Sequence, residues 1–210
     1  MSSLDGLKWR YATQKFDEHK IISQEKIEVI KQAFNLTPTS YGMQPVRLII
    51  IQNKTILKKL FEFTYWQDQI RTASHLLVFC TETNIDEKFI KDTFKLEKEI
   101  RDTPNDIIEK SMKFRLELFN SWTAKEKEQW ALNQLYLTLG NVLHICANER
   151  IDACPMEGFE PKKYDDYLKL PEQNLKSQLL LPIGYRAKDD FFADFKKVRR
   201  PLDEMVIEIN

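Results

Sequence analysis

Glycine is scarce in this chain, and that scarcity limits the folds that the chain can adopt. Its five glycines, spread over 210 residues, are too far apart to form GxGxxG or GxxxxGK. Both motifs need closely spaced glycines, because backbone amides must approach a phosphate without an intervening Cβ atom. A glycine-loop dinucleotide fold and a P-loop are therefore excluded, and a bound nucleotide would be held mainly by side chains.

The overall composition is that of a globular protein, with 42% hydrophobic and 30% charged residues. Lys and Arg together number 32 and so do Asp and Glu, which gives a formal net charge of zero. The balance gives no reason to expect nucleic acid or an anionic membrane as a partner.

The cysteines and the apolar runs predict a cytoplasmic location. Cys80, Cys146 and Cys154 are odd in number and lack CxxC spacing, which favours a reducing compartment and argues against a structural zinc site. The first residues lack the features of a signal peptide, and the longest apolar runs, such as 76–80, are far short of the ~20 residues of a membrane span. No metal site is expected.

Amphipathic helical segments alternate with short apolar strands along the chain. The spacing of apolar residues predicts helices over 23–34 and 54–63, and β-branched or apolar runs predict strands over 46–51, 75–80 and 178–184. This order predicts an α/β or α+β fold with helices on both faces of the sheet.

The middle of the chain is predicted to be helical. Residues 86 to about 120 have the pattern of two exposed helices, with Pro104 at the first position of the second. Thr123 and Glu126 form a capping box that opens the longest helix. That helix is apolar on most faces over 130–147, so we expect it to be central and buried.

Two elements are predicted towards the C-terminus. Pro161 suits the first position of a short helix. Residues 206–209 read as a terminal strand with no hairpin partner beside it in the sequence.

Four local features have the residue types that chemistry requires. Residues 10–16 place two cations near a hydroxyl, 38–45 form a polar loop, 155–159 form a glycine-bearing turn, and 196–201 carry four cations before a proline. If these features have no functional role, they are, in the same order, a solvated segment, a connecting loop, a turn and a solvated face. The functional interpretation of the last is a phosphate clamp, because Arg offers forked donors and Lys a point charge.

Other reactive residue types are expected to be structural. His75 begins an apolar strand, which is typical of a satisfied histidine at a strand end. His144 and Cys146 lie on the central helix and are expected to be core residues.

The order and spacing of these features resemble the nitroreductase family of FMN-dependent oxidoreductases, in particular the oxygen-insensitive NAD(P)H nitroreductase and dihydropteridine reductase type. The resemblance spans nearly the whole chain and rests on seven blocks in family order: RYATxKFD at 10–17, PTSYGMQP at 38–45, ASHLLVF at 73–79, QLYLxLGN at 134–141, PMEGF at 155–159, LPIGY at 181–185 and KVRRP at 197–201.

The resemblance implies the fold and the assembly. It implies an α+β fold with a mixed, mainly antiparallel sheet wrapped by helices on both faces. It also implies one FMN-binding domain over 1–210, with residues of about 86–122 as a helical lid. The implied assembly is a domain-exchanged homodimer in which the strand at 206–209 joins the partner's sheet.

The resemblance also implies the binding site. Arg10, Lys197 and Arg199 match phosphate-contacting cations, the loop at Pro38 to Ser40 matches the segment that reaches the partner's flavin, and the Glu157–Gly158 turn matches the one beside flavin N5. The implied FMN-binding residues are Arg10, Tyr11, Ala12, Gln14, Pro38, Thr39, Ser40, Gly42, Gln67, Gln69, Pro155, Met156, Glu157, Gly158, Lys197 and Arg199.

This chain departs from its closest relatives at the flavin ring. Gln14 stands where they carry lysine, Trp66 and Gln69 where they carry Asn and Lys, and Gly42 where they carry Asn. Gln67 and Gln69 can still hydrogen-bond the pyrimidine edge of the flavin, since an amide supplies both donor and acceptor atoms. Loss of a cation there predicts a lower flavin potential.

The implied activity is a two-electron, ping-pong transfer of hydride from NADH or NADPH through FMN to a nitroaromatic, quinone or pteridine-type acceptor. No side chain is needed as an essential acid or base, because the cofactor supplies the chemistry. Two flavoprotein alternatives remain: a reductase dedicated to one physiological substrate, and a flavin-carrying binding or sensor protein with little turnover. A third alternative is a helical interaction module without a cofactor.

Overall fold

A four-stranded antiparallel sheet organises the chain in the computed structural model, which describes residues 3–209. The strands lie in the order β1-β2-β4-β3, and each neighbouring pair is antiparallel. Their bounds are β1 Val46–Ile51, β2 His75–Glu82, β3 Asp152–Ala153 and β4 Leu175–Gly184. A mixed sheet is predicted, but all strand pairs of the described residues are antiparallel. The parallel pairing is an isolated bridge between Ala12 and Ala153.

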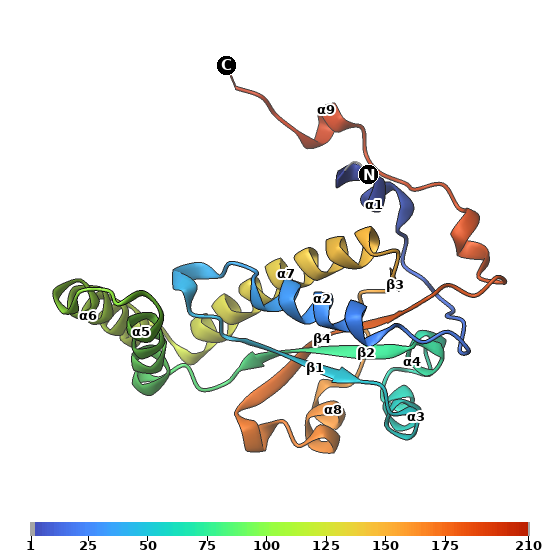
Figure 1. Cartoon of the computed structure of the whole chain (residues 1–210). Coiled ribbons are helices and arrows are strands. Elements are labelled where there is room, and N and C mark those ends of the chain that lie inside the picture. The colour runs from blue at the N-terminus through green and yellow to red at the C-terminus, as the bar shows by residue number, and fades with distance from the viewer. Residues whose placement is uncertain (1–2, 210) are drawn as a thin grey trace.

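Helices cover both faces of the sheet (Figure 1). They are α1 Ser3–Trp9, α2 Gln24–Asn35, α3 Lys54–Glu62, α4 Asp68–Thr72, α5 Glu87–Arg101, α6 Asn105–Ser121, α7 Ala124–Asn148, α8 Pro161–Leu168 and α9 Leu202–Met205, with short 3₁₀ turns at Ser40–Gly42, Pro171–Gln173 and Phe191–Asp194. This arrangement confirms the α+β class with helices on both faces.

The alternation of side chains along β2 divides the core into two layers. Leu77 and Phe79 pack with α2 and α7, whereas Leu76 and Val78 pack on the opposite face with α3 and α8. Because successive strand residues point to opposite faces, one continuous apolar strand fills both layers. This explains why the predicted 75–80 strand is hydrophobic without a break.

The two helices predicted over residues 86 to about 120 are confirmed as α5 and α6, which lie together beyond one end of the sheet (Figure 1). Pro104 is the residue just before α6, with ψ of 140°, so the prediction of its position is wrong by one residue. Phe119 is buried at the base of this pair, with its ring centroid 4.6 Å from that of Trp122 and 4.9 Å from that of Trp130.

The capping box that opens α7 is confirmed. The backbone N–H of Thr123 donates to Glu126 Oε2 at 2.7 Å, and the Glu126 N–H donates to Thr123 Oγ1 at 3.3 Å. The prediction that this helix is buried on most faces is wrong, because Tyr136 and Leu137 are about half exposed. Within the described residues α7 packs against the sheet, α1 and α2, and the side that carries Tyr136 and Leu137 stays exposed.

The chain leaves the sheet after β4 and runs past α1 to a C-terminus that projects from the body (Figure 1). Residues 206–209 follow α9 and pair with no described strand, so the predicted terminal strand does not form within one chain. Among the helices of residues 3–209, none combines the length and apolar character needed to cross a membrane.

Candidate active site

A buried carboxylate fixes the N-terminal segment that carries the first predicted site residues. Asp190 Oδ2 accepts hydrogen bonds from the Tyr11 hydroxyl at 2.9 Å, from the Gln14 N–H at 2.9 Å and from the Lys15 N–H at 3.2 Å. Burial, together with the contact to Asp190, raises the pKa of Tyr11. The segment is therefore held against the chain that follows β4.

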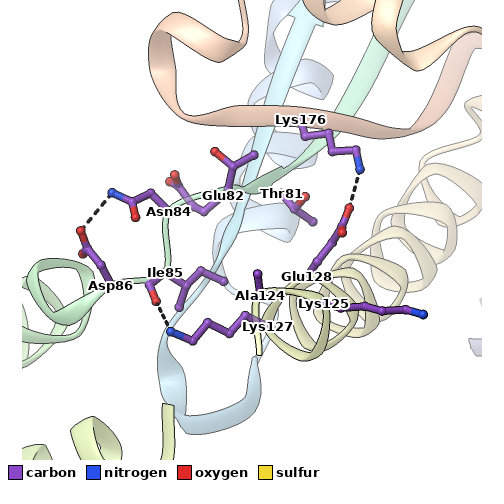
Figure 2. Close-up of a pocket in the computed structure, with 11 residues that line it drawn as sticks. Thr81, Glu82, Asn84, Ile85, Asp86, Ala124, Lys125, Lys127, Glu128 and Lys176 are labelled. Carbon is purple, nitrogen blue, oxygen red and sulfur yellow. Dashed lines mark hydrogen bonds and ion pairs between the residues drawn. The ribbon is translucent and has the colours of Figure 1, made fainter. Parts of the chain in front are cut away.

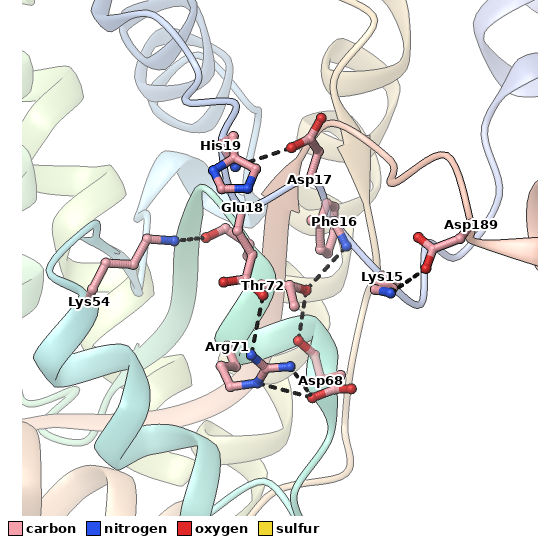
Figure 3. A network of polar contacts seen from close by, with 11 residues as sticks. Lys15, Phe16, Asp17, Glu18, His19, Lys54, Asp68, Arg71, Thr72 and Asp189 are labelled. Atoms are coloured by element: carbon pink, nitrogen blue, oxygen red, sulfur yellow. Dashed lines mark hydrogen bonds and ion pairs between the residues drawn. The ribbon is translucent and has the colours of Figure 1, made fainter.

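Polar contacts also tie this segment to α4 (Figure 3). The Phe16 N–H donates to Thr72 Oγ1 at 3.1 Å, and Arg71 of α4 pairs with Glu18 at 3.2 Å. Lys15 forms an ion pair with Asp189 at 2.5 Å. These contacts set the position of α4 relative to the segment that begins at Arg10.

Three of the four cations that line a pocket of about 460 Å³ beside α1 are predicted site residues, and the fourth is Lys8. Arg10, Lys197 and Arg199 line it, and the Lys197 ammonium donates to the backbone carbonyl of Arg10. Burial lowers the pKa of Lys197, and the nearby charges of Arg10 and Arg199 lower it further. Burial and Arg199 likewise lower the pKa of Arg10.

No carboxylate of residues 3–209 forms an ion pair with these three side chains. Mutually repelling cations without a carboxylate form a natural site for a polyanion such as a phosphate. The residues present therefore fit the phosphate of FMN.

Two amide side chains lie side by side next to this pocket. Gln69 Nε2 donates to Gln14 Oε1 at 2.5 Å, and Gln14 Nε2 donates to the carbonyl of Ala12 at 2.9 Å. Gln14 Nε2 also lies 3.9 Å from the sulfur of Cys154, whose pKa burial raises to about 11. The structure thus joins the first predicted feature to α4 and to the chain just before the 155–158 turn.

The 155–158 turn is held on both sides. Met156 and Leu180 exchange two backbone hydrogen bonds of 2.9 Å, and beyond them Tyr136 donates to Glu157 Oε1 at 2.6 Å. Gln67 Nε2 donates to the Gly158 carbonyl at 2.8 Å.

The backbone N–H groups of Glu157 and Gly158 have no acceptor within residues 3–209. A Cβ atom added to Gly158 would meet the end of the Gln67 side chain at 3.2 Å and no other group. Packing within the chain does not require glycine here. The exposed turn therefore offers two adjacent donors to a ligand that approaches the backbone closely.

The polar loop at 38–45 lies elsewhere. The loop that carries Pro38, Thr39, Ser40 and Gly42 joins α2 to β1 at the end of the molecule near α5 and α6, away from α1 (Figure 1). Its Ser40 N–H donates to Gln134 Oε1 at 2.8 Å. The structure therefore brings together the residues of the other three features and leaves this loop apart from them.

Several residues that shape the site escaped the sequence analysis. Asp190 and Tyr136 act on partners 176 and 21 residues away in the sequence, so no local pattern marks them. Tyr136 does belong to the QLYLxLGN block, and its hydroxyl, on an otherwise apolar helical segment, was the available signal.

The most voluminous of the pockets described here, about 560 Å³, is a different one (Figure 2). It lies where β2 ends and α7 begins, and charged side chains on both sides of it are joined in the Lys176–Glu128 ion pair. It contains none of the predicted site residues, so it is not the candidate active site.

Comparisons with known proteins agree with this geometry. YfkO of Bacillus subtilis is 32% identical over 202 residues, which cover 89% of each chain. The oxygen-insensitive NAD(P)H nitroreductase of Salmonella typhimurium is 28% identical, with 95% of this chain and 96% of the relative covered. A protein of Exiguobacterium sibiricum, solved in complex with FMN, has the same fold with a TM-score of 0.85 at 18% identity, covering 100% of this chain and 98% of its own. Residues 7–185 match the Nitroreductase family, and the chain is a member of that family, an enzyme of the NAD(P)H nitroreductase type.

Proposed function

We propose that this chain binds FMN and uses NADH or NADPH to reduce nitroaromatic, quinone or pteridine-type acceptors. The observation that carries the proposal is the pocket of Arg10, Lys197 and Arg199, whose lining includes no carboxylate. The contact between Gln14 and Cys154 connects the segment after Arg10 to the chain just before the 157–158 turn. The FMN complex of a protein with the same fold and the name of the Salmonella relative support it.

The three cations would hold the FMN phosphate. Arg199 and Lys197 come from the segment after β4 and Arg10 from the segment after α1, so the site forms only when both are in place. Tyr11 and Ala12 position this site through the Asp190 contact and the bridge to Ala153.

The amide pair Gln14–Gln69 would face the pyrimidine edge of the ring. Gln67 has a different role from the one that the resemblance suggested. Its Nε2 already donates to the carbonyls of Thr64 and Gly158, so we assign Gln67 to holding the turn.

FMN, when bound, supplies two-electron hydride chemistry at N5. The Glu157 and Gly158 N–H groups would donate to the ring edge there without changing protonation. Glu157 accepts the Tyr136 hydrogen bond and orients the turn, and Pro155 and Met156 anchor it to β4. No side chain of the turn is required to move a proton.

We further propose a homodimer in which the partner's loop at Pro38, Thr39, Ser40 and Gly42 completes each site. Two observations support this. The loop lies away from the cation pocket of its own chain, and α9 with residues 206–209 projects from the body with exposed apolar side chains such as Leu202 and Ile207 (Figure 1). The segment 206–209 would then pair with the partner's sheet.

A flavin carrier with little turnover is the second candidate function. The neutral Gln14–Gln69 pair favours it, because a cation at this edge would stabilise the negative charge of reduced flavin and neutral amides stabilise it less. Reduction by NAD(P)H would then be slow or incomplete.

An anaerobic titration separates these functions. The purified protein should be yellow, NADH or NADPH should bleach it, and an added quinone or nitroaromatic should restore the colour. A flavin carrier would stay yellow with either donor, and a colourless protein that takes up no FMN would refute the proposal.

A further inference from the structure

A second pocket, of about 520 Å³, lies between the 38–45 loop and the helix pair α5–α6. The loop contributes Tyr41 and Gly42, and the two helices contribute Arg101, Ser111 and Arg115. The loop and these two helices lie at the end of the molecule away from α1, which borders the candidate phosphate site (Figure 1).

The guanidinium of Arg115 lies beside two aromatic rings at this pocket. Its guanidinium carbon lies 4.8 Å from the ring centroid of Phe94 and 5.4 Å from that of Tyr41. Contacts of this kind cover the faces of a guanidinium and leave its N–H edges available. Those edges make no hydrogen bond or ion pair within residues 3–209.

The charges that line the pocket sum to a positive value. Arg101 and Arg115 face one carboxylate, Glu97, which already accepts a hydrogen bond of 3.1 Å from the Thr103 hydroxyl. A half-buried arginine whose donors are unused, beside a surplus of positive charge, is a recognition group for an oxyanion.

The loop wall of the pocket is under backbone strain. Tyr41 has φ of 57° and Gly42 has φ of 65°, and this left-handed region is unfavourable for a residue with a bulky side chain. Contacts of the Tyr41 ring with Arg115 and with Phe119, at 6.2 Å between ring centroids, stabilise the conformation. Arg115 thereby joins the pocket to the loop that carries Thr39 and Ser40.

We propose that this pocket is an oxyanion-selecting subsite of the enzyme and that Arg115 is the residue that recognises the oxyanion. The subsite favours an electron donor or acceptor that bears an additional phosphate or carboxylate over the counterpart that lacks this group. The assignment of the ligand as donor or acceptor rests on the proposed function; the oxyanion site itself does not.

Two pairs of probes, differing by one oxyanion, test this on the purified protein by isothermal titration calorimetry. 4-Nitrobenzoate against 4-nitrobenzamide represents the acceptor, and NADP⁺ against NAD⁺ represents the donor. We expect the member with the additional oxyanion in at least one pair to bind about tenfold more tightly, in the range of a hydrogen bond to a charged group. The affected pair identifies which ligand carries the oxyanion.

Arg115→Gln should reduce that ratio at least severalfold, Arg115→Lys should retain part of it, and Lys113→Gln, on the exposed side of the same helix, should leave it unchanged. If Arg115→Gln proves misfolded by circular dichroism, Arg101→Gln tests the same pocket and should lower the ratio by a smaller factor. Equal binding within both pairs by the unmodified protein, or an unchanged ratio in a folded Arg115→Gln, overturns the proposal. Because the readout is binding, failure of NAD(P)H oxidation would count against the proposed function alone.

Discussion

The hydroxyl of Tyr136, on α7, donates a 2.6 Å hydrogen bond to Glu157 Oε1 in the turn after β3. The bond joins the long helix to the backbone segment whose two N–H groups are without acceptors. It also raises the pKa of Tyr136, because the carboxylate stabilises the protonated phenol.

We predict that Glu157 orients this turn and does not transfer protons. Glu157→Gln, whose amide oxygen still accepts from Tyr136, should keep FMN and lose less than ~10-fold in steady-state rate, below the roughly 10²–10⁴ typical of a general acid or base. Tyr136→Phe should give a loss of similar size. A Glu157→Gln enzyme that retains FMN but cannot be reduced by NAD(P)H would show that Glu157 is a catalytic acid.

Arg199→Ala and Lys197→Ala should each weaken FMN binding. The expected loss is about 1.5 to 3 kcal/mol, the range for hydrogen bonds to charged groups. The dissociation constant can be measured from the quenching of FMN fluorescence. Lys196→Ala is the matched control, because Lys196 lies in the same segment but does not line the pocket. Equal FMN affinity in all three variants would contradict the assignment of Arg199 and Lys197 to the FMN phosphate.

Gly158 and Gly184 should respond to added side chains in different ways. A Cβ atom at Gly184 would lie 2.8 Å from the Phe16 ring and 3.2 Å from the backbone nitrogen of Ser74, so Gly184→Ala should reduce the free energy of unfolding by about 1–3 kcal/mol. Gly158→Val should fold almost normally but expel or tilt the flavin. Thermal melts of the apoprotein and FMN absorption spectra distinguish these effects, and a fully active Gly158→Val would place the flavin elsewhere.

We predict that the yellow species is a dimer. Light scattering should give twice the chain mass. Removal of residues 202–210 should weaken the dimer, because the truncated chain lacks the exposed apolar side chains that would be buried against the partner. An active, flavin-loaded monomer would contradict the assignment of the loop at Pro38 to Ser40 to the partner's site.

His75 should make the protein less stable at mildly acidic pH. It is buried next to Ser74, whose hydroxyl lies 2.9 Å from Nδ1, and burial together with the charge of Lys54 lowers its pKa. The unfolded chain protonates His75 at its ordinary pKa of ~6.5, so the stabilising contribution is complete above that pH and declines as the pH falls below it. The melting temperature of His75→Gln should fall less between pH 7.5 and 5 than that of the unmodified protein, whereas the exposed His19→Gln should behave like the unmodified protein.

The sequence by itself determined the local elements, because their signals lie within a few neighbouring residues. The capping box of Thr123 and Glu126 and the apolar run at 75–80 each act over one helical turn or one strand, and both appear where they are predicted. The phosphate-binding chemistry of residues 196–201 was also readable from their four cations, whereas the role of Arg10 came from the family resemblance.

Only the tertiary structure decided which of these residues meet. Lys197 reaches Arg10 across 187 positions, and Asp190 reaches Gln14 across 176, so their contacts leave no periodic trace in the sequence. The course of the chain after β4 and the packing of α4 against the N-terminal segment create these contacts. The exposed side of α7 and the unpaired residues 206–209 differ from the predictions for a related reason: apolar periodicity shows that a face will be buried, but not whether its own chain or another molecule covers it.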